Sequence, residues 1–502
     1  MVNHIRVVVI LLSVLLVALS ITGCKDFDGL RARFETEKLF YKATRAVEIL
    51  PLSPGINKAE NADSVRSHFS KVLDYVDKNV SRAEGVDVLQ MKRLAGFSHL
   101  KIAETYAVEK EYVDSYQAYK KAVVEFSEDI QIAFTAAFRA AEILEKASDY
   151  RGALGEYESL FRTYPLTEFD APPLVEYIES PVRVASLYLK LNDRKSYERA
   201  LREARAFFQT GIEHFKHEPA IVNRFKLEIA GSYSAEGKHN EAIAVYNTIT
   251  DAGGIRLLEV RLRTGLEYME GLKDHGSAAR EFRDIITEFP DSISISSRAQ
   301  FGLAMVYYNQ KDYESARDEF LRIEKDYPQA IGLISKGHWF YAMSFEKEGK
   351  WDRALVEYQF ILANYPETSE GNEVPLHIAK HYLDSGDKKA SEKSFENAIT
   401  EYRRIISKFG KSPISSQAYA NIAKCYIQQK KWDDAVEALL ETWGKFPDSY
   451  LGSKALLTAA DISEKNLKDN DRAIDIYKKF LDRYPWISDN DYIERKIERL
   501  SN

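Results

Sequence analysis

The stretch from Phe289 to Pro328, FPDSISISSRAQFGLAMVYYNQKDYESARDEFLRIEKDYP, begins and ends on an aromatic residue followed by proline. The same dipeptide returns after an equal interval at Tyr365-Pro366. Further copies are Tyr164-Pro165, Phe446-Pro447 and Tyr484-Pro485, and the last two are again separated by the same interval. Self-similarity at a fixed period of this length indicates an array of similar units.

A small side chain and a large one, aromatic in every copy but one, recur at fixed distances from each of these prolines. Ala316 and Phe320 precede Pro328, and pairs at equivalent positions precede the other prolines: Ala153 and Tyr157, Ala278 and Phe282, Ala354 and Tyr358, Ala435 and Leu439, Ala473 and Tyr477. Upstream lies a second apolar stripe, for example Leu303, Ala304 and Tyr307, at helical spacing. Each unit therefore predicts two helices joined by a polar turn, and the proline ends the second helix.

This pattern resembles the tetratricopeptide repeat, which has a small residue where its two helices cross, flanking aromatics and a closing proline. The period here, from Pro328 to Pro366, is longer than the ~34 residues of that repeat, and the extra residues follow the proline. The joint, an aromatic residue and proline followed by Ser or Thr at Ser292, Thr368 and Ser449, is similar to that of BamD outer-membrane assembly lipoproteins and periplasmic YbgF-type proteins. The resemblance covers most of residues 95–490.

The expected fold is all-α, and the resemblance implies a right-handed superhelical solenoid of stacked helix-turn-helix units. We expect about ten units over residues 93–490, with two irregular ones: residues 166–220 fit the repeat poorly, and near 375–413 the spacing requires longer helices or a longer turn. Residues 24–92 have helical patterns outside the period and predict a helical cap, since terminal units of such arrays are commonly atypical. Residues 491–502 predict a helical tail.

The first residues predict a secretion and anchoring signal, assigned to residues 1–23. An apolar run from Val7 to Ile21 follows Arg6, and it is shorter than the ~20 residues that span a bilayer. The segment Ile21-Thr22-Gly23-Cys24 resembles the lipobox of bacterial lipoproteins, which implies lipidation of Cys24. Lys25, in place of Asp, favours the periplasmic face of the outer membrane. An uncleaved anchor helix is the alternative.

Composition and motifs point away from catalysis and from nucleic acid. Acids and bases are mixed along a chain of formal net charge −7, without a basic stripe. His377 and His381 lack the glutamate of the zinc-protease helix and a third ligand, so they are expected to be ordinary surface or interhelix histidines. Cys425 is expected to be a small buried hydrophobe. We therefore expect no metal, cofactor or catalytic residue.

A solenoid of this kind offers an extended concave surface, lined mainly by the first helix of each unit, that suits proteins or peptides. First-helix side chains outside the packing stripe are candidates for that groove: Arg298, Phe301, Met305, Tyr308, Lys336, Trp339 and Met343. The alternative for Phe301 and Trp339 is packing against a neighbouring helix.

Resemblance implies a lipid-anchored periplasmic scaffold of envelope biogenesis, whose partners include β-barrel assembly components. Two other hypotheses stay open: a lipoprotein of a polysaccharide-export or pilus-secretion machine, and an envelope glycan-cleaving enzyme with a helical superhelical domain. Against the enzyme, the units run almost to residue 490 and leave no room for a catalytic domain.

Overall fold

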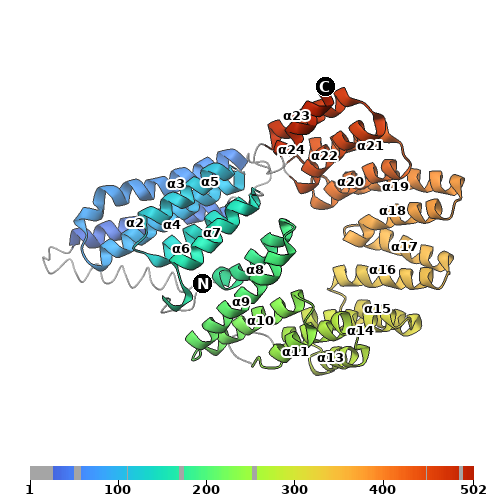
Figure 1. The fold of residues 1–502 in the computed structure, drawn as a ribbon, viewed down its shortest axis with the longest axis horizontal. Helices are drawn as coiled ribbons and strands as arrows, with labels where there is room; N and C mark the ends of the chain where they lie inside the picture. Colours follow the sequence, from blue (N-terminus) through green and yellow to red (C-terminus); the bar gives the residue numbers. More distant parts are fainter. Residues whose placement is uncertain are drawn as a thin grey trace. The chain divides into compact units, whose positions relative to one another are not determined.

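The computed structural model describes residues 27–49, 58–109, 111–147, 149–168, 175–250, 257–447, 449–484 and 490–501. These residues form 23 α-helices and no strand (Figure 1). They divide into two compact units, which meet in the sequence between Glu168 and Phe169, and each unit is described by itself. The signal assigned to residues 1–23 and the candidate lipidation residue Cys24 lie outside the described residues.

The first unit packs antiparallel helices in chain order (Figure 1). Val65, Phe69 and Val72 of α3 are fully or almost fully buried and form one core cluster with Met91 and Ala95 of α4. Helices α2 and α3 thus pack against α4, which begins at Val86. The elements are α2 (Phe27–Ile49), α3 (Lys58–Asn79), η2 (Val80–Arg82), α4 (Val86–Glu109), α5 (Tyr112–Glu125), α6 (Ile130–Lys146), α7 (Tyr150–Thr163) and η3 (Leu166–Glu168).

The described residues of the second unit form eight helical hairpins and a final helix, each hairpin packed on the next along the chain (Figure 1). Its elements are α8 (Val175–Lys190), α9 (Arg194–His214), α10 (Pro219–Ala235), α11 (His239–Tyr246), α12 (Leu257–Leu266), η4 (Glu267–Gly271), α13 (His275–Glu288), α14 (Ile293–Asn309), α15 (Tyr313–Asp326), α16 (Ile331–Lys347), α17 (Trp351–Asn364), α18 (Ser369–Asp384), α19 (Lys388–Phe409), α20 (Pro413–Gln428), α21 (Trp432–Lys445), α22 (Tyr450–Ile462), η5 (Ser463–Leu467), α23 (Asn470–Arg483) and α24 (Asn490–Ser501). The predicted all-α solenoid of helical hairpins is confirmed.

The aromatic-proline dipeptides end the second helices, as the sequence predicted. In α15 and α17 the last helical residue comes directly before Tyr327 and Tyr365, and these tyrosines leave the helical conformation with ψ of 58° and 43°. The following proline disfavours the helical conformation in the residue before it. Thr368 then starts α18 by accepting a hydrogen bond from the Gly371 N–H, as Ser449 does for α22 from Gly452.

The alanines stand where two helices cross. Ala316, Ala354 and Ala435 have no exposed surface, and the large side chains one turn later, such as Phe320 and Tyr358, are buried beside them. A small residue at the crossing allows close approach of the backbones, and the neighbouring aromatic fills the space to the next hairpin. This packing repeats along the second unit and explains the regular spacing in the sequence.

The two irregular hairpins, α8–α9 and α18–α19, share one construction. Their second helices have 21 and 22 residues, against 14 in α13, α15 and α17, so the extra length lies in the second helix and not in the turn. Each first helix has a proline at its seventh position, Pro181 or Pro375. In α18 the tyrosine hydroxyl of Tyr402, on the long helix, accepts a hydrogen bond from the Leu376 N–H at 3.1 Å.

Helices in the second unit form two layers of unequal spacing. Successive first helices, α14 with α16, α16 with α18 and α18 with α20, contact one another directly. Successive second helices, such as α19 and α21, make no contacts of that extent within the described residues. Each first helix is therefore visible between two second helices on what we call the second-helix face, and the opposite side, formed by the first helices, is the first-helix face.

The first helices α12 and α22 end in a π-helical turn that contains one residue more than the end of α14. The π-helical turns η4 and η5 end α12 and α22, so the Asp274 N–H reaches the Tyr268 carbonyl and the Asp469 N–H reaches the Ser463 carbonyl, six residues back. In α14 the equivalent bond, from Asp312 to Tyr307, spans five residues. Among the described helices, none is both long enough and apolar enough to cross a bilayer.

Candidate functional site

The predicted groove residues of α14 and α16 lie on the first-helix face, and most are partly enclosed by neighbouring helices. Lys336 is exposed and the other six are half-buried. Met305 packs against two core clusters and Met343 against a third. These side chains therefore both support the stacking of hairpins and present part of their surface to solvent.

Phe301 is the centre of an aromatic group shared by α14, α15 and α16. Its ring lies 5.6 Å from Phe320 and 5.8 Å from Phe340, and the Lys336 ammonium stands 4.9 Å from its centroid. Tyr308 joins the group 5.5 Å from Phe340, and burial raises the pKa of Tyr308 to about 12. An ammonium over an aromatic face is an attractive cation–π contact. Phe301 thus packs against neighbouring helices, as the alternative interpretation held, and keeps a cation over its ring.

Trp339 forms the next part of the same face. Its ring lies 5.3 Å from Tyr358 of α17 and 5.0 Å from His377 of α18, so it bridges two hairpins. Trp339 also packs against the buried core cluster of α16 and α17, and its side chain stays half-buried. Half-exposed aromatic and methionine side chains held rigidly by a core are the kind of surface that anchors protein partners.

Arg298 belongs to a row of charges that the sequence did not reveal. Its guanidinium donates two hydrogen bonds to Glu259 of α12, at 2.7 and 3.2 Å, and Arg224 of α10 pairs with Glu179 of α8 at 2.6 Å. Burial, followed by the charge of Glu179, raises the pKa of Glu228 between them. The first helices from α8 to α14 therefore carry paired charges, whereas the other candidates on α14 and α16, apart from Lys336, are aromatic and methionine side chains.

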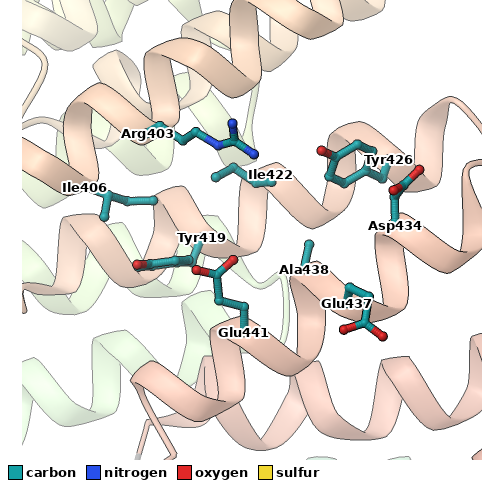
Figure 2. A pocket seen from close by; sticks show the side chains of 9 residues that line it. All are labelled: Arg403, Ile406, Tyr419, Ile422, Tyr426, Asp434, Glu437, Ala438 and Glu441. Carbon is teal, nitrogen blue, oxygen red and sulfur yellow. The ribbon is translucent and has the colours of Figure 1, made fainter.

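A separate hollow of about 580 Å³ lies on the second-helix face between α19 and α21 (Figure 2). Its floor is formed by α20, with Tyr419, Ile422 and Tyr426 on one stripe of that helix. The α19 wall carries Arg403 and Ile406, and the α21 wall carries Asp434, Glu437, Ala438 and Glu441. In Figure 2 Glu441 reaches toward the Tyr419 end and Asp434 lies at the Tyr426 end.

The electrostatics of this hollow are dominated by the α21 wall. Burial, then the nearby charge of Glu441, raises the pKa of Tyr419. Glu437 pairs with Arg472 of the next hairpin at 2.7 Å, while Arg403, Asp434 and Glu441 form no ion pair within the described part of the chain. Sequence reasoning missed this site. The sequence does contain a signal for it. The residue nine positions before the closing proline is a glutamate in other units, such as Glu319 and Glu357, but an alanine, Ala438, before Pro447.

The candidate reactive groups occupy structural positions. Cys425 has no exposed surface, and burial raises the pKa of its thiol to about 12. His377 bonds to Glu346 of α16 at 3.0 Å, and His381 stacks on Trp351 of α17 with centroids 3.3 Å apart. Both are therefore interhelix histidines. In the part of the chain that the structure describes, no group of three His, Cys, Asp or Glu side chains is arranged to hold a metal ion.

Comparison with protein-family models identifies the repeats. A model described as tetratricopeptide repeat matches residues 262–331 and 376–450, and a second model of that description matches residues 454–485. This chain carries tetratricopeptide repeats. The matched segments coincide with the hairpins from α12 to α15 and from α18 to α23, where the aromatic, alanine and proline positions recur.

Solved tetratricopeptide-repeat and other structures give more distant likenesses. A tetratricopeptide repeat protein from Parabacteroides merdae ATCC 43184 is 15% identical over 65% of this chain and 99% of its own, with a TM-score of 0.26. The apo form of RapI is 14% identical over 74% and 99%, with a TM-score of 0.41, and yeast Tom70 is 12% identical over 93% and 96%, with a TM-score of 0.36. No curated protein matches the chain significantly.

Proposed function

We propose that this chain is a lipid-anchored scaffold of the bacterial envelope that holds partner proteins on its first-helix face and performs no chemistry itself. The observation that carries the proposal is the aromatic and methionine surface of α14 and α16, with Phe301 beneath Lys336 and Trp339 between two hairpins. Repeat arrays use extended surfaces of this kind to bind proteins.

The anchor rests on the amino-terminal sequence. Ile21-Thr22-Gly23-Cys24 follows a short apolar run and ends on a cysteine, the arrangement of a lipoprotein signal. Several acyl chains on Cys24 would hold the repeats stably at a membrane, where one chain alone binds only weakly. Lys25 supports the periplasmic face of the outer membrane. The proposed partners are envelope proteins, among them β-barrel assembly components.

Site-specific photocrosslinking in intact cells tests the partner surface. A photoreactive benzoylphenylalanine in place of Lys336, exposed on the first helix α16, should give discrete crosslinked products with envelope proteins. The matched control is the same replacement at Lys325, an exposed lysine on the second helix α15. Equal crosslinking from the two positions, or none from Lys336, would contradict the role of the first-helix face.

The anchor has its own test. In the Cys24→Ala variant we expect the acyl mass to be absent and the protein to leave the outer-membrane fraction. An unchanged mass and distribution would rule out lipidation at Cys24.

Incubation of the purified chain with peptidoglycan should release no soluble fragments. Turnover that a single carboxylate substitution abolishes would show that the chain is an enzyme instead.

A further inference from the structure

In three consecutive hairpins, a polar pair closes the second-helix face. The side chain from the first helix bonds to a glutamate nine residues before the closing proline: Arg261 to Glu281 at 3.3 Å, Gln300 to Glu319 at 2.6 Å, and His338 to Glu357. His338 also contacts Glu324 of the preceding second helix at 3.2 Å, so the space between α15 and α17 is bridged from both sides. These pairs fill the position where a first helix is visible between two second helices.

The hairpin α20–α21 lacks this closure. Its equivalent residues are Tyr419 and Ala438, and a methyl group cannot reach across to a phenol as a glutamate side chain would. One further bridge is also absent. Arg283 of α13 donates to the Tyr307 hydroxyl at 2.5 Å, but the equivalent Arg403 forms no such bond with Tyr426. The hollow therefore lies where the polar pairs of the three hairpins from α12 to α17 are absent.

The open walls have unequal charge. The α21 wall presents three carboxylates and the α19 wall one guanidinium. Arg472 pairs with Glu437 and with Asp433, and among the described residues no cation pairs with Asp434 or Glu441, which stand at the two ends of the hollow. Tyr426 and Tyr419 lie beside them on the floor. Carboxylates flanking aromatic rings favour a cation, since both attract positive charge and the rings also contact its apolar stem.

We propose that this hollow is a second docking site, on the face opposite the partner groove, which takes a basic side chain from an extended segment of a partner protein. An arginine is favoured because its planar guanidinium can stack on a tyrosine while donating to Asp434 or Glu441. Arg403 on the other wall then donates to backbone carbonyls of the same segment. A volume of about 580 Å³ accommodates one long side chain with its adjoining backbone.

Binding of matched peptide pools to the full-length chain in a neutral detergent tests this assignment. Each pool contains fluorescein-labelled, acetylated twelve-residue peptides with mixed Ala, Ser, Leu and Tyr positions around one fixed central residue. The fixed residue is arginine, its neutral isostere citrulline, or glutamate, and fluorescence anisotropy reports binding at low ionic strength. We expect the arginine pool to bind at least fivefold more tightly than the citrulline pool, and the glutamate pool to bind most weakly.

Variants of the chain locate the site. Asp434→Asn combined with Glu441→Gln should weaken the arginine pool about fivefold to tenfold and leave the citrulline pool unchanged. Ala438→Leu, which fills the hollow without changing charge, should weaken both pools. The matched control is Asp433→Asn, which removes an exposed carboxylate from the same helix outside the hollow and should leave the binding of all pools unchanged.

Three results would overturn the proposal: equal binding of the arginine and citrulline pools, tighter binding of the glutamate pool, or loss of arginine binding in Asp433→Asn to the same extent as in the double variant. The last result would mean that the whole acidic surface of α21 attracts cations. Trp339→Ala, on the opposite face, should not affect the pools, so this site can fail while the proposed groove stands, and the reverse also holds.

Discussion

The replacement of Lys496 by methionine should release the last helix from the array. The Lys496 ammonium on α24 donates to Asp461 at 2.6 Å, to Glu464 at 2.8 Å and to the Tyr477 hydroxyl at 2.6 Å, and its side chain is only 8% exposed. Around it, Ile493 is buried in the same core cluster, and Ile497 and Leu500 pack against that cluster. One buried cation thus joins α24 to α22, η5 and α23.

The free-energy cost of Lys496→Met depends on the two carboxylates that lose their cation. Removing one partner of a buried ion pair costs about 3–5 kcal/mol, because the other charge stays uncompensated. Here Glu464 is 10% exposed and keeps Arg499 at 2.6 Å, while Asp461 is 44% exposed and keeps Lys465 at 3.3 Å. Residual pairing and solvent reduce the cost, so we expect ~2–3 kcal/mol for local opening of α24, roughly a 30- to 150-fold loss of protection.

Amide hydrogen exchange of α24, analysed by mass spectrometry of its peptides, measures this opening. Lys465→Met is the matched control, since it removes a lysine that pairs with the same Asp461 but is 60% exposed, and it should change protection by less than ~0.5 kcal/mol. If the α24 amides exchange as slowly in Lys496→Met as in the wild-type chain, or if the two variants exchange at the same rate, Lys496 does not hold the helix in place.

The same tether has a defined pH dependence. Burial opposes ionisation, yet hydrogen bonds from Lys496 and Tyr477 lower the pKa of Asp461 and of Glu464, and the two carboxylates in turn raise the pKa of Lys496 against its desolvation. Stabilisation by the carboxylates is therefore present above about pH 4 and lost as pH falls through their lowered values. Stabilisation by Lys496 is present below about pH 10 and lost as pH rises through its raised value.

Three further predictions concern single positions. A Cβ on Gly371 would stand 2.1 Å from the Tyr365 carbonyl oxygen, and a Cβ on Gly452 would stand 2.0 Å from the Phe446 carbonyl oxygen. Alanine at either position should therefore lower the free energy of unfolding, measured by chemical denaturation, by ~1–3 kcal/mol. Gly231 has open space where a Cβ would stand, so Gly231→Ala should raise the free energy of unfolding by ~0.5–1 kcal/mol. Lys311 and Gly349 occupy the same hairpin-turn position with φ of 65° and 73°, so Gly349→Ala should reduce the melting temperature while Lys311→Gly should preserve or raise it. In a Cys24→Ala background, Cys425 should react with iodoacetamide at pH 8 at least a hundredfold more slowly in the folded chain than in denaturant, and rapid labelling of the folded chain would contradict its burial.

The sequence predicted the hairpins because their determinants are local and repeat. A proline ends a helix wherever it stands, and an alanine at a helix crossing is required in every unit, so residues such as Pro328 and Ala316 mark the period directly. The extra length near residue 400 was also expected from spacing. Its location in α19 rather than in a turn required the structure, because an unpunctuated helical pattern does not fix where a helix begins.

The side-chain partners could not be predicted in the same way. Arg298 pairs with Glu259 and Lys496 with Asp461, residues 39 and 35 positions away on other helices. Such pairs depend on how far each helix is rotated toward its neighbour, and the π-helical turns η4 and η5 each add one residue at the end of a first helix. The sequence indicates the hollow beside Ala438 only when the residues of one unit are aligned with those of its neighbours.

The equal spacing of Pro290, Pro328 and Pro366 makes the hairpin between two of these prolines an exchangeable part. Deleting residues 290–327 would join Phe289 to Pro328, recreating the aromatic-proline junction, and would place α13 against α16 in the position that α14 holds now. The hydrophobic stripe would meet an equivalent stripe, since Tyr341, Ala342 and Phe345 stand where Leu303, Ala304 and Tyr307 stood. The array can thus be shortened or lengthened there by one whole hairpin, and its length becomes an adjustable dimension for protein engineers.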